Sequence, residues 1–423
     1  MQRGAPEGDM ESPSRAPASD ERRGNAALLA ELVVLDFTRV LAGPHCTRML
    51  ADLGARVIKI ERPGEGDEMR RAPLRLPGEG DQSTYFARRN AGKESVGLDL
   101  GKPEARSVVL DLAAKADVVV ENFVPGVAER LGCGYASLSA VRPDIVYASI
   151  SGYGQTGPDS RQGAFAHVIA AASGIMYLDA DPELGPRSSH LQAADVLAGT
   201  NALSGILAAL WRRTKTGQGA RIDVSMLESL IAAEDIAFGA VPNGGQAVPG
   251  PRPGMGLSRV DGRWLAWQSG GAPALWPRLV SMLERPDLLR DPRFESPEMR
   301  RESWPELERI VSEWLGARED VHRAAEALRA ARIPCAIVQS PAEVVRHPQI
   351  IFREAFGDID HPGGGRVRVS ASPYWIDDRP VPARGAAPYR IGEHTEPVLR
   401  GLLGYGDERL EALVRAGAIA PPG

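Results

Sequence analysis

Short apolar runs alternate with amphipathic segments through the first half of the chain, and this alternation most constrains the fold. Two segments, 44–53 and 103–116, place apolar residues three or four positions apart, as helices do. Strands that alternate with helices favour a parallel sheet of the doubly wound type, so we predict an α/β fold. The runs that we expect to form buried strands are 32–37, 55–61, 95–100, 117–123 and 144–151.

The rest of the chain suggests a second, smaller domain. An apolar helix at 196–213 and a further strand complete the first α/β body, and 240–274 is then rich in Gly and Pro. A strand within 261–269 and helices at 275–284, 304–317 and 319–331 follow. We therefore expect a disordered tail at 1–27, a large domain at 28–234, a smaller α+β domain at 235–345, and a segment at 346–423 that returns to the large domain.

Composition excludes several classes of protein. The formal net charge is −5 and the pI is about 5.9, which argues against a nucleic-acid binder. Cys46, Cys133 and Cys335 are odd in number, far apart and without metal-ligand spacing, which fits a reducing compartment. The apolar, uncharged stretch 196–211 is shorter than the roughly 20 apolar residues of a membrane span. We expect a cytoplasmic protein with no metal, no nucleic-acid partner and no membrane partner.

One motif matches the dinucleotide-binding fingerprint of dehydrogenases without its structural context. Gly152 to Gly157, GYGQTG, match G-x-G-x-x-G after an expected strand. Pro158 to Arg161 follow as a turn rather than the required helix, and the strand comes late in the fold. A tight turn that faces a ligand is therefore the better interpretation. The chain lacks the phosphate loop G-x-x-x-x-G-K-[ST], the zinc motif H-E-x-x-H and the elbow G-x-S-x-G.

Asp195 is the most suggestive carboxylate, because it directly precedes the apolar helix. The partial positive charge of a helix N-terminus favours an ionised carboxylate, which can act as a nucleophile. Asp is also a preferred N-cap, and the two interpretations are compatible. Histidines such as His45, His167 and His394 are scattered and more often structural. Several basic residues lie near expected strand ends, where α/β sheets bind ligands, but a residue of this kind is more often solvated on the surface than in contact with a ligand. They are Lys59, Arg62, Arg70, Arg71, Lys93 and Arg130.

Taken together, these motifs resemble the class III coenzyme A transferases, the CaiB/BaiF or formyl-CoA transferase family. The resemblance covers nearly the whole chain after residue 28. It implies an interlocked homodimer of two-domain subunits, a Rossmann-like large domain and an active site between subunits. It implies no tightly bound cofactor, with coenzyme A, acyl-CoA and carboxylic acids as substrates. The segments that carry it are LVVLDFTRVLAGPHCTRMLADLGARVIKIERPGEGD, NAGKESVGLDL, ADVVVENFVPGVAERLG, SISGYGQTGP, AADVLAGTNALSGILAALWRRTKTGQGARIDVSML and GEHTEPVL.

The resemblance also assigns residues. The family's nucleophilic aspartate falls on Asp195, which would attack an acyl-CoA thioester, form a mixed anhydride and then an aspartyl-CoA thioester. A carboxylate is mostly ionised near neutral pH, so this nucleophile needs no general base. The positions that match the family's coenzyme A contacts are Val40, Leu41, Ala42, Arg62, Leu98, Asp99, Leu100, Asn122, Phe123, Val124 and Arg130.

The chain departs from formyl-CoA transferase at the positions Leu41, Gly101, Gly163 and Ala166. The resemblance places Phe165, Ala166 and His167 in the substrate pocket, and the apolar Leu41, Phe165 and Ala166 favour a larger or less polar acyl group. Two alternatives remain open at this point. The first is a 2-methylacyl-CoA racemase, whose second acid/base would have to be His167, on the same strand face as Phe165. The second is a CoA-binding protein without turnover.

Overall fold

The computed structural model describes residues 28–75, 82–181, 183–250, 252–269, 273–362 and 365–421 of the 423-residue chain. The expected tail at 1–27 lies outside the described residues. Contacts between Cα atoms divide the chain into two compact units. The first unit is Met1–Gly163, Asp195–Ser225 and Glu354–Gly423, and the second is Ala164–Ala194 and Met226–Arg353.

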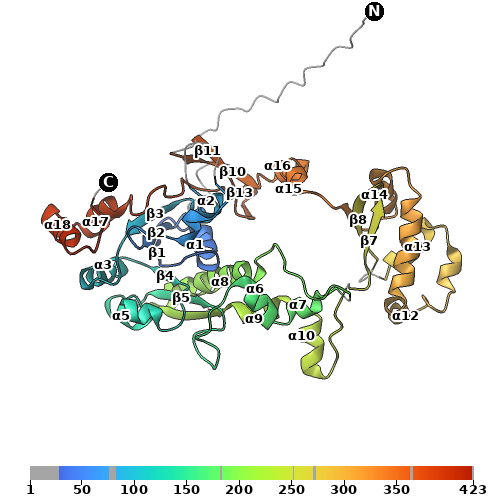
Figure 1. Cartoon of the computed structure of the whole chain (residues 1–423), viewed down its shortest axis with the longest axis horizontal. Coiled ribbons are helices and arrows are strands. Elements are labelled where there is room, and N and C mark those ends of the chain that lie inside the picture. The colour runs from blue at the N-terminus through green and yellow to red at the C-terminus, as the bar shows by residue number, and fades with distance from the viewer. Residues whose placement is uncertain are drawn as a thin grey trace, which may run out of the picture. The chain divides into compact units, whose positions relative to one another are not determined.

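A six-stranded sheet in the order β3-β2-β1-β4-β5-β6 organises the first unit (Figure 1). Every neighbouring pair in it is parallel, which confirms the expected α/β class with a parallel, Rossmann-like sheet. The chain order reverses between β1 and β4, so their carboxyl ends form a topological switch point. The strands are β1 (Val33–Asp36), β2 (Arg56–Glu61), β3 (Lys93–Gly97), β4 (Val118–Glu121), β5 (Val146–Ser151) and β6 (Ala220–Ser225).

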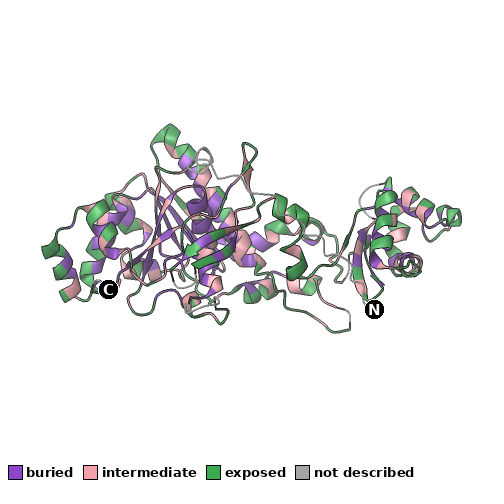
Figure 2. Ribbon diagram, turned by 90° about the horizontal axis from the view of Figure 1, so that it is seen from above, coloured by how far each residue is buried: buried purple, intermediate pink, exposed green. Residues whose placement is uncertain are grey.

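The central strands are almost entirely buried, as the purple ribbons of Figure 2 show. Strands covered on both faces read as continuous apolar runs, and this is why they were recognisable in the sequence. One core joins Leu35, Ile58 and Val119 of the sheet to Val108 and Leu112 of α3. Further helices of this unit are α1 (Ala42–Asp52), α2 (Thr84–Asn90), α3 (Pro103–Ala113), α4 (Val127–Leu131), α5 (Tyr135–Val141) and α8 (Ala193–Thr216), with the 3-10 turn η2 (Glu68–Arg71).

Helix α8 begins three residues earlier than expected and runs for 24 residues. By length and composition it could cross a membrane, and a core helix has the same properties. Ala198, Ala202 and Ile206 on one of its faces are fully buried. A Cβ built on Gly199 would lie 2.4 Å from the carbonyl oxygen of Ala42. Helices α8 and α1 therefore touch backbone to backbone at this point.

The C-terminal segment packs onto the core of the first unit. Val398 and Leu399 of α17 (Thr395–Leu403) and Leu410 and Leu413 of α18 (Asp407–Arg415) join the same hydrophobic cluster as Val108 of α3. A hairpin of β10 (Phe356–His361) and β11 (Gly365–Ser370) and a short pair, β12 (Trp375–Ile376) and β13 (Arg379–Pro380), precede these helices.

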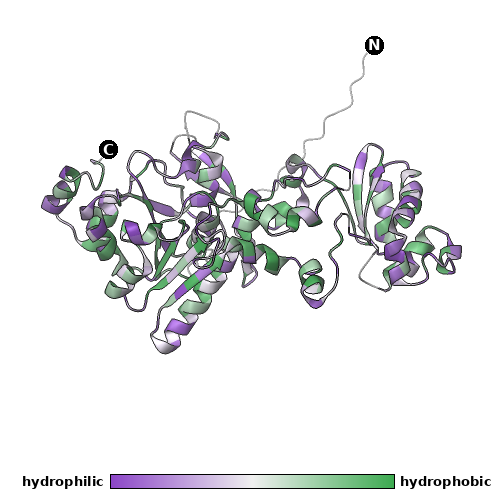
Figure 3. Ribbon diagram, turned by 60° about the horizontal axis from the view of Figure 1, so that its bottom comes forward, coloured by the Kyte–Doolittle hydropathy of each residue, from purple (hydrophilic) through white to green (hydrophobic). Residues whose placement is uncertain are grey.

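The second unit has its own core, in which Trp267, Trp276 and Trp304 pack with Leu279 and Val311. Its antiparallel sheet follows the order β7-β8-β9. Hydrophobic and hydrophilic stretches alternate around its helices, as amphipathic packing requires (Figure 3). Its elements are β7 (Met255–Val260), β8 (Arg263–Gln268), β9 (Cys335–Ile337), α6 (Ala166–Ala172), α7 (Ile175–Leu178), α9 (Met226–Ala233), α10 (Ala237–Ala240), η3 (Val241–Asn243), α11 (Leu275–Met282), η4 (Pro286–Leu289), α12 (Pro297–Glu302), α13 (Trp304–Gly316), α14 (Val321–Ala330), α15 (Pro341–Val344) and α16 (Pro348–Phe352).

This division differs from the domain boundaries drawn from the sequence mainly at one internal segment, and by nine and eight residues at the two ends of the smaller domain, where 226–234 and 346–353 also group with the second unit. Residues 164–194 group with the second unit, whereas the sequence placed them in the large domain. The sequence signals at 235 and 346 were a Gly/Pro-rich stretch and a return of strand-like pieces, and 164–194 carries neither signal. The expected domain boundaries remain a prediction.

Candidate active site

A pocket of about 350 Å³ opens at the carboxyl ends of β1 to β4, at the switch point of the sheet. Open α/β sheets bind ligands at this place, because loops diverge there to opposite faces of the sheet. Of the residues assigned to coenzyme A from the sequence, Arg62, Leu98, Asp99, Leu100 and Phe123 line the pocket. Its other lining residues are Phe37, Arg39, Lys59, Ile60, Glu61, Glu65, Gly66, Asp67, Gly101, Val127 and Leu131.

Asn122 joins two loops at the rim of this pocket. Its side-chain amide donates to the carbonyl of Arg39 at 2.8 Å, and its Oδ1 accepts the N–H of Arg39 at 2.9 Å. Asn122 therefore fixes the loop after β1 to the loop after β4. Val124 is exposed, and Arg130 is exposed on α4, where its carbonyl accepts Nη2 of Arg106. Neither of these two belongs to the pocket lining.

Val40, Leu41 and Ala42 form the turn that leads into α1. Val40 has a φ of 68°, in the left-handed region that a β-branched residue rarely adopts. Its N–H donates to Oδ1 of Asp67 at 3.3 Å. Leu41 is the N-cap of α1 and Ala42 is its first residue, and both are buried. Strained backbone of this kind persists only where the surroundings fix it, and it is frequent at functional sites.

Two buried lysines, Lys59 and Lys93, form hydrogen bonds and ion pairs with residues around this turn. Lys59 donates to the carbonyl of Thr38 at 2.7 Å and pairs with Asp67 at 3.0 Å. Lys93 pairs with Asp36 at 2.9 Å and donates to Oγ1 of Thr47 at 2.7 Å. Both side chains are completely buried, so the expectation that basic residues near strand ends decorate the surface is wrong for these two.

The charges of this cluster stabilise one another. Burial opposes the ionisation of Asp36, but Lys93 and Lys59 overcome it and lower the pKa of Asp36 to about 2. Burial likewise opposes the charge of Lys59, and Asp67, Asp36 and Glu61 together raise its pKa above the ordinary value. Glu61 accepts bonds from Arg70 and from Oγ of Ser95, both at 2.6 Å. The sequence did carry a signal for these pairs, because Asp36, Lys59 and Glu61 are charged residues within otherwise apolar strands. A charge in a buried strand requires a partner of opposite charge.

Asp195 is the third residue of α8 and lies in its first turn, so the interpretation of Asp195 as the N-cap is wrong. The helix extends further because Ala193 and Ala194 are good helix formers. The side chain of Asp195 is half-buried. Residues four apart share a helix face, so Asp195 lies on the same face as Gly199, whose Cα touches the start of α1.

Two side chains of α2 respond to the charge of Asp195. Burial raises the pKa of Tyr85, and the carboxylate of Asp195 makes a smaller contribution in the same direction. This carboxylate also opposes the lowering of the pKa of Arg89, which burial and Arg88 bring down to about 10. Tyr85 and Arg89 are four residues apart and share one face of α2. The sequence analysis assigned no role to either residue.

The three residues assigned to the acyl pocket lie together at the start of α6, in the second unit. Phe165 is the N-cap and is 64% exposed, Ala166 is buried, and His167 is exposed with Nδ1 3.2 Å from Oγ of Ser188. The expectation that Phe165 and His167 share a strand face is wrong, because the segment is helical. Gly152 to Gly157 form a turn after β5 with no helix directly after it, as expected, and Asp223 accepts the N–H of Gln155.

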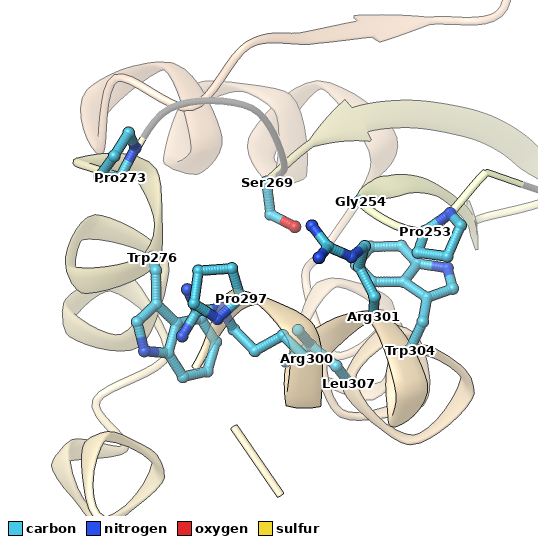
Figure 4. A pocket seen from close by; sticks show the side chains of 10 residues that line it. All are labelled: Pro253, Gly254, Ser269, Pro273, Trp276, Pro297, Arg300, Arg301, Trp304 and Leu307. Carbon is cyan, nitrogen blue, oxygen red and sulfur yellow. The ribbon is translucent and has the colours of Figure 1, made fainter. Parts of the chain in front are cut away.

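A second cavity, of about 260 Å³, lies within the second unit (Figure 4). Trp276 and Trp304 lie at its two ends, and Arg300 and Arg301 lie between them. Arg300 donates to the carbonyl of Phe294 at 2.7 Å and stacks over Trp276, while Arg301 pairs with Glu298 at 3.0 Å. Both guanidinium groups are thus engaged by the protein itself. Among the residues that the structure describes, no group of three or more His, Cys, Asp or Glu could hold a metal ion.

Comparison with known proteins places this geometry in one family. The model of CoA-transferase family III matches residues 29–395. A succinyl-CoA:mesaconate CoA-transferase from Haloarcula hispanica is 35% identical over 91% of this chain and 99% of its own. The human succinyl-CoA:glutarate CoA-transferase is 31% identical over 95% of this chain and 92% of its own. A formyl-CoA:oxalate CoA-transferase from Streptomyces coelicolor is 31% identical over 93% and 100%, respectively.

Solved structures agree. Rv3272 from Mycobacterium tuberculosis superposes with a TM-score of 0.77 at 28% identity, over 88% of this chain and 99% of that one. A CAIB/BAIF family protein from Brucella suis gives a TM-score of 0.75 at 28% identity, over 89% and 100%. The similarity therefore extends over both units of the chain.

Proposed function

The chain belongs to CoA-transferase family III, and from this premise we propose that it moves coenzyme A between an acyl-CoA thioester and a free carboxylic acid through a covalent intermediate on Asp195. One observation carries the assignment of the nucleophile. Asp195 stands in the first turn of α8, on the face whose Gly199 touches Ala42 at the start of α1. Ala42 in turn follows the loop that lines the pocket at the strand ends.

The proposed reaction exchanges one carboxyl derivative for another. An oxygen of Asp195 attacks the thioester carbonyl, the C–S bond breaks, and the products are a mixed anhydride and the CoA thiolate. The thiolate attacks the aspartyl carbonyl, which releases the donor acid and leaves an aspartyl-CoA thioester. The acceptor carboxylate then repeats these two steps in reverse. No oxidant, reductant or net proton transfer is required.

Two features of the chain support this chemistry. The N-terminal turn of α8 carries a partial positive charge that favours the ionised, nucleophilic form of Asp195. Helix geometry also leaves the N–H groups of Ala42 and Gly43, in the first turn of α1, without intrahelical acceptors. Donors of this kind stabilise the oxyanions that form at each attack. The assignment of these donors belongs to the proposal.

The pocket at the strand ends is the proposed site of coenzyme A. Arg62 lines it with a side chain that is 61% exposed and pairs only with Glu65, at 3.0 Å, in the described part of the chain. An exposed guanidinium at a strand end suits a phosphate contact. The relatives named above each exchange coenzyme A between two carboxylic acids, and we propose the same general reaction here. We also propose that the protein is cytoplasmic and forms a homodimer. Light scattering of the purified protein tests the oligomeric state.

The deciding experiment traps the intermediate. The protein is incubated with a panel of acyl-CoA thioesters, hydroxylamine is added, and peptides that contain Asp195 are analysed by mass spectrometry. We expect a hydroxamate on Asp195 that depends on an acyl-CoA. Asp195→Asn should form none and should lose at least about a thousandfold in exchange rate, because an amide is a poor nucleophile. Exchange that persists in this variant, or a hydroxamate on another residue, would overturn the assignment.

The racemase alternative would require His167 as a base beside the substrate. His167 is exposed on α6 and bonds Ser188, and no observation favours this role. Deuterium uptake at Cα of a 2-methylacyl-CoA in D2O, without any acceptor acid, would support the racemase instead. Binding of CoA without either reaction would indicate a protein that has lost turnover.

A further inference from the structure

Arg89 on α2 has an unusual partner for a half-buried guanidinium. Its Nη1 donates to Nδ1 of His45 at 2.9 Å. Because a guanidinium has no acceptor, Nδ1 must carry the lone pair and the ring proton must sit on Nε2. Burial, with Arg89 and Arg88 nearby, lowers the pKa of His45 to about 4. The partner of Arg89 is therefore a neutral ring at neutral pH.

A chain of hydrogen bonds fixes this pair to α8. Nε2 of His45 lies 3.4 Å from Oγ1 of Thr200, and that hydroxyl donates to the carbonyl of Val196 at 2.9 Å. Val196 directly follows Asp195 in the first turn of α8. The guanidinium is thus held in place through α1 and α8, two helices that also touch at Gly199 and Ala42.

The charge of Arg89 is not neutralised by the protein. Within the described residues, no carboxylate oxygen lies within 4 Å of its guanidinium, and His45 is its one hydrogen-bond acceptor. Other buried arginines of this unit differ, since Arg48 pairs with Asp52 at 2.8 Å and Arg70 pairs with Glu61 at 2.6 Å. Most of the five N–H donors of Arg89 therefore remain for a ligand.

The position of Arg89 relates it to the reacting carboxylate. Arg89 shares a face of α2 with Tyr85, and both groups feel the charge of Asp195. Arg88 and Arg48 add positive potential around the same helix. A cation in electrostatic reach of the nucleophile, without a protein carboxylate beside it, is a site for an anionic part of the substrate.

We propose that Arg89 binds the second carboxylate of a dicarboxylic acid whose first carboxylate reacts at Asp195. This inference rests on the proposed function and specifies its substrate class. The second carboxylate forms and breaks no covalent bond in the exchange, and it stays ionised throughout. A planar guanidinium receives it through two parallel hydrogen bonds, a geometry that a lysine cannot reproduce. A monocarboxylic acid of equal length would leave the half-buried guanidinium unpaired, which penalises its binding.

The test uses two acids of four carbons, succinate and butyrate. Isotope exchange is measured between labelled succinate and succinyl-CoA, and between labelled butyrate and butyryl-CoA, with the full-length protein. We expect kcat/KM to favour succinate by at least about a hundredfold. A ratio below about ten would overturn the site for a second carboxylate, while the proposed function would stand. Absence of exchange with every acid, despite CoA binding, would instead overturn the proposed function.

Variants distinguish a specific effect of Arg89 from the effect of losing any positive charge on α2. Arg89→Met should lower the succinate to butyrate ratio by about a hundredfold, and Arg89→Lys should recover only part of it. Arg88→Met is the matched control, because Arg88 lies on the same helix but donates to Oγ of Ser370. It removes the same charge and should change the ratio by less than about threefold. Equal effects of the two methionine variants would overturn the assignment to Arg89.

A further variant keeps the test decisive should Arg89→Met not fold. His45→Phe retains the guanidinium but removes its only acceptor in the described chain. We expect the succinate to butyrate ratio to fall by about fivefold or more, because the guanidinium loses its fixed orientation. A purely structural role of His45 would lower both exchange rates equally and leave the ratio unchanged, and this result would contradict the proposal.

Discussion

Two groups of cations in the first unit look alike in the sequence and differ in the structure. Lys59 and Lys93, beneath the pocket, are completely buried and each pairs with a carboxylate. Arg89, near Asp195, is half-buried and rests against a neutral histidine. The difference lies in the partner. A buried cation that is paired with a carboxylate cannot be removed without leaving a buried charge, whereas a cation without a carboxylate is available to a substrate.

The largest effect on stability is expected for Lys93→Met. Removal of the ammonium group leaves Asp36 buried without its nearest cation, and breaking a buried pair in this way costs about 3–5 kcal/mol. The free energy of unfolding from denaturant titration measures the change. Lys115→Met, at an exposed position in the turn after α3, is the control and should change it by less than about 0.5 kcal/mol. Equal effects at the two positions would contradict the structural role of Lys93.

Glu121 extends the comparison to a buried carboxylate without a lysine partner. Burial raises its pKa to about 7, although Ser149 and the N–H of Phe123 donate to it. A pKa raised on folding stabilises the fold at low pH, and this contribution is lost between about pH 4.5 and pH 7. We expect the free energy of unfolding to fall by about 3 kcal/mol over this range. In Glu121→Gln the fall should shrink by about this amount, whereas Glu31→Gln, at an exposed position, should leave it unchanged.

Arg62 stands between the two groups, because it pairs with Glu65 but remains exposed. Arg62→Ala should weaken CoA binding by about tenfold, since a charge-assisted contact to phosphate is lost. Glu65→Ala should leave binding equal or tighter, because the guanidinium loses a competing carboxylate. Isothermal titration with CoA measures both, and Lys115→Ala serves as the control for charge. An unchanged affinity in Arg62→Ala would remove this residue from the site.

The smallest effect on stability is expected for Arg89→Met. This substitution leaves no carboxylate unpaired, so the free energy of unfolding should change by less than about 1 kcal/mol. Denaturant titration next to Lys93→Met makes the comparison direct. A loss as large as that of Lys93→Met would place Arg89 among the structural cations and would contradict the proposal that Arg89 is available to a substrate.

The sheet was predictable from the sequence for a physical reason. Strands buried on both faces need continuous apolar runs, and such runs at 32–37, 55–61 and 117–123 correspond to β1, β2 and β4. The turn at Gly152 was predictable because Pro158 follows where a helix would have to begin. The start of α8 was predicted within one turn, at 196 rather than at Ala193, and this difference moves Asp195 from the N-cap into the helix.

The environment of Asp195 could not be predicted, because it is assembled from separate helices. His45, Arg89 and Thr200 lie on α1, α2 and α8, and no spacing in the sequence connects them. The segment at 165–167 was misread because so short a segment, Phe165 to His167, has no periodicity that distinguishes a strand from a helix. Buried lysines were misjudged because the burial of a charge depends on a partner such as Asp67, which lies in a loop.

The contact between Gly199 and Ala42 has a consequence for how this site can change. Even one methyl group at position 199 would collide with a carbonyl oxygen, which has no rotamer that could avoid it. Helices α1 and α8 can therefore approach this closely only because residue 199 has no side chain. The same close approach fixes the position of Asp195, which lies one turn before Gly199 on α8. Glycine is the one residue that position 199 can accept as long as α1 and α8 keep this distance.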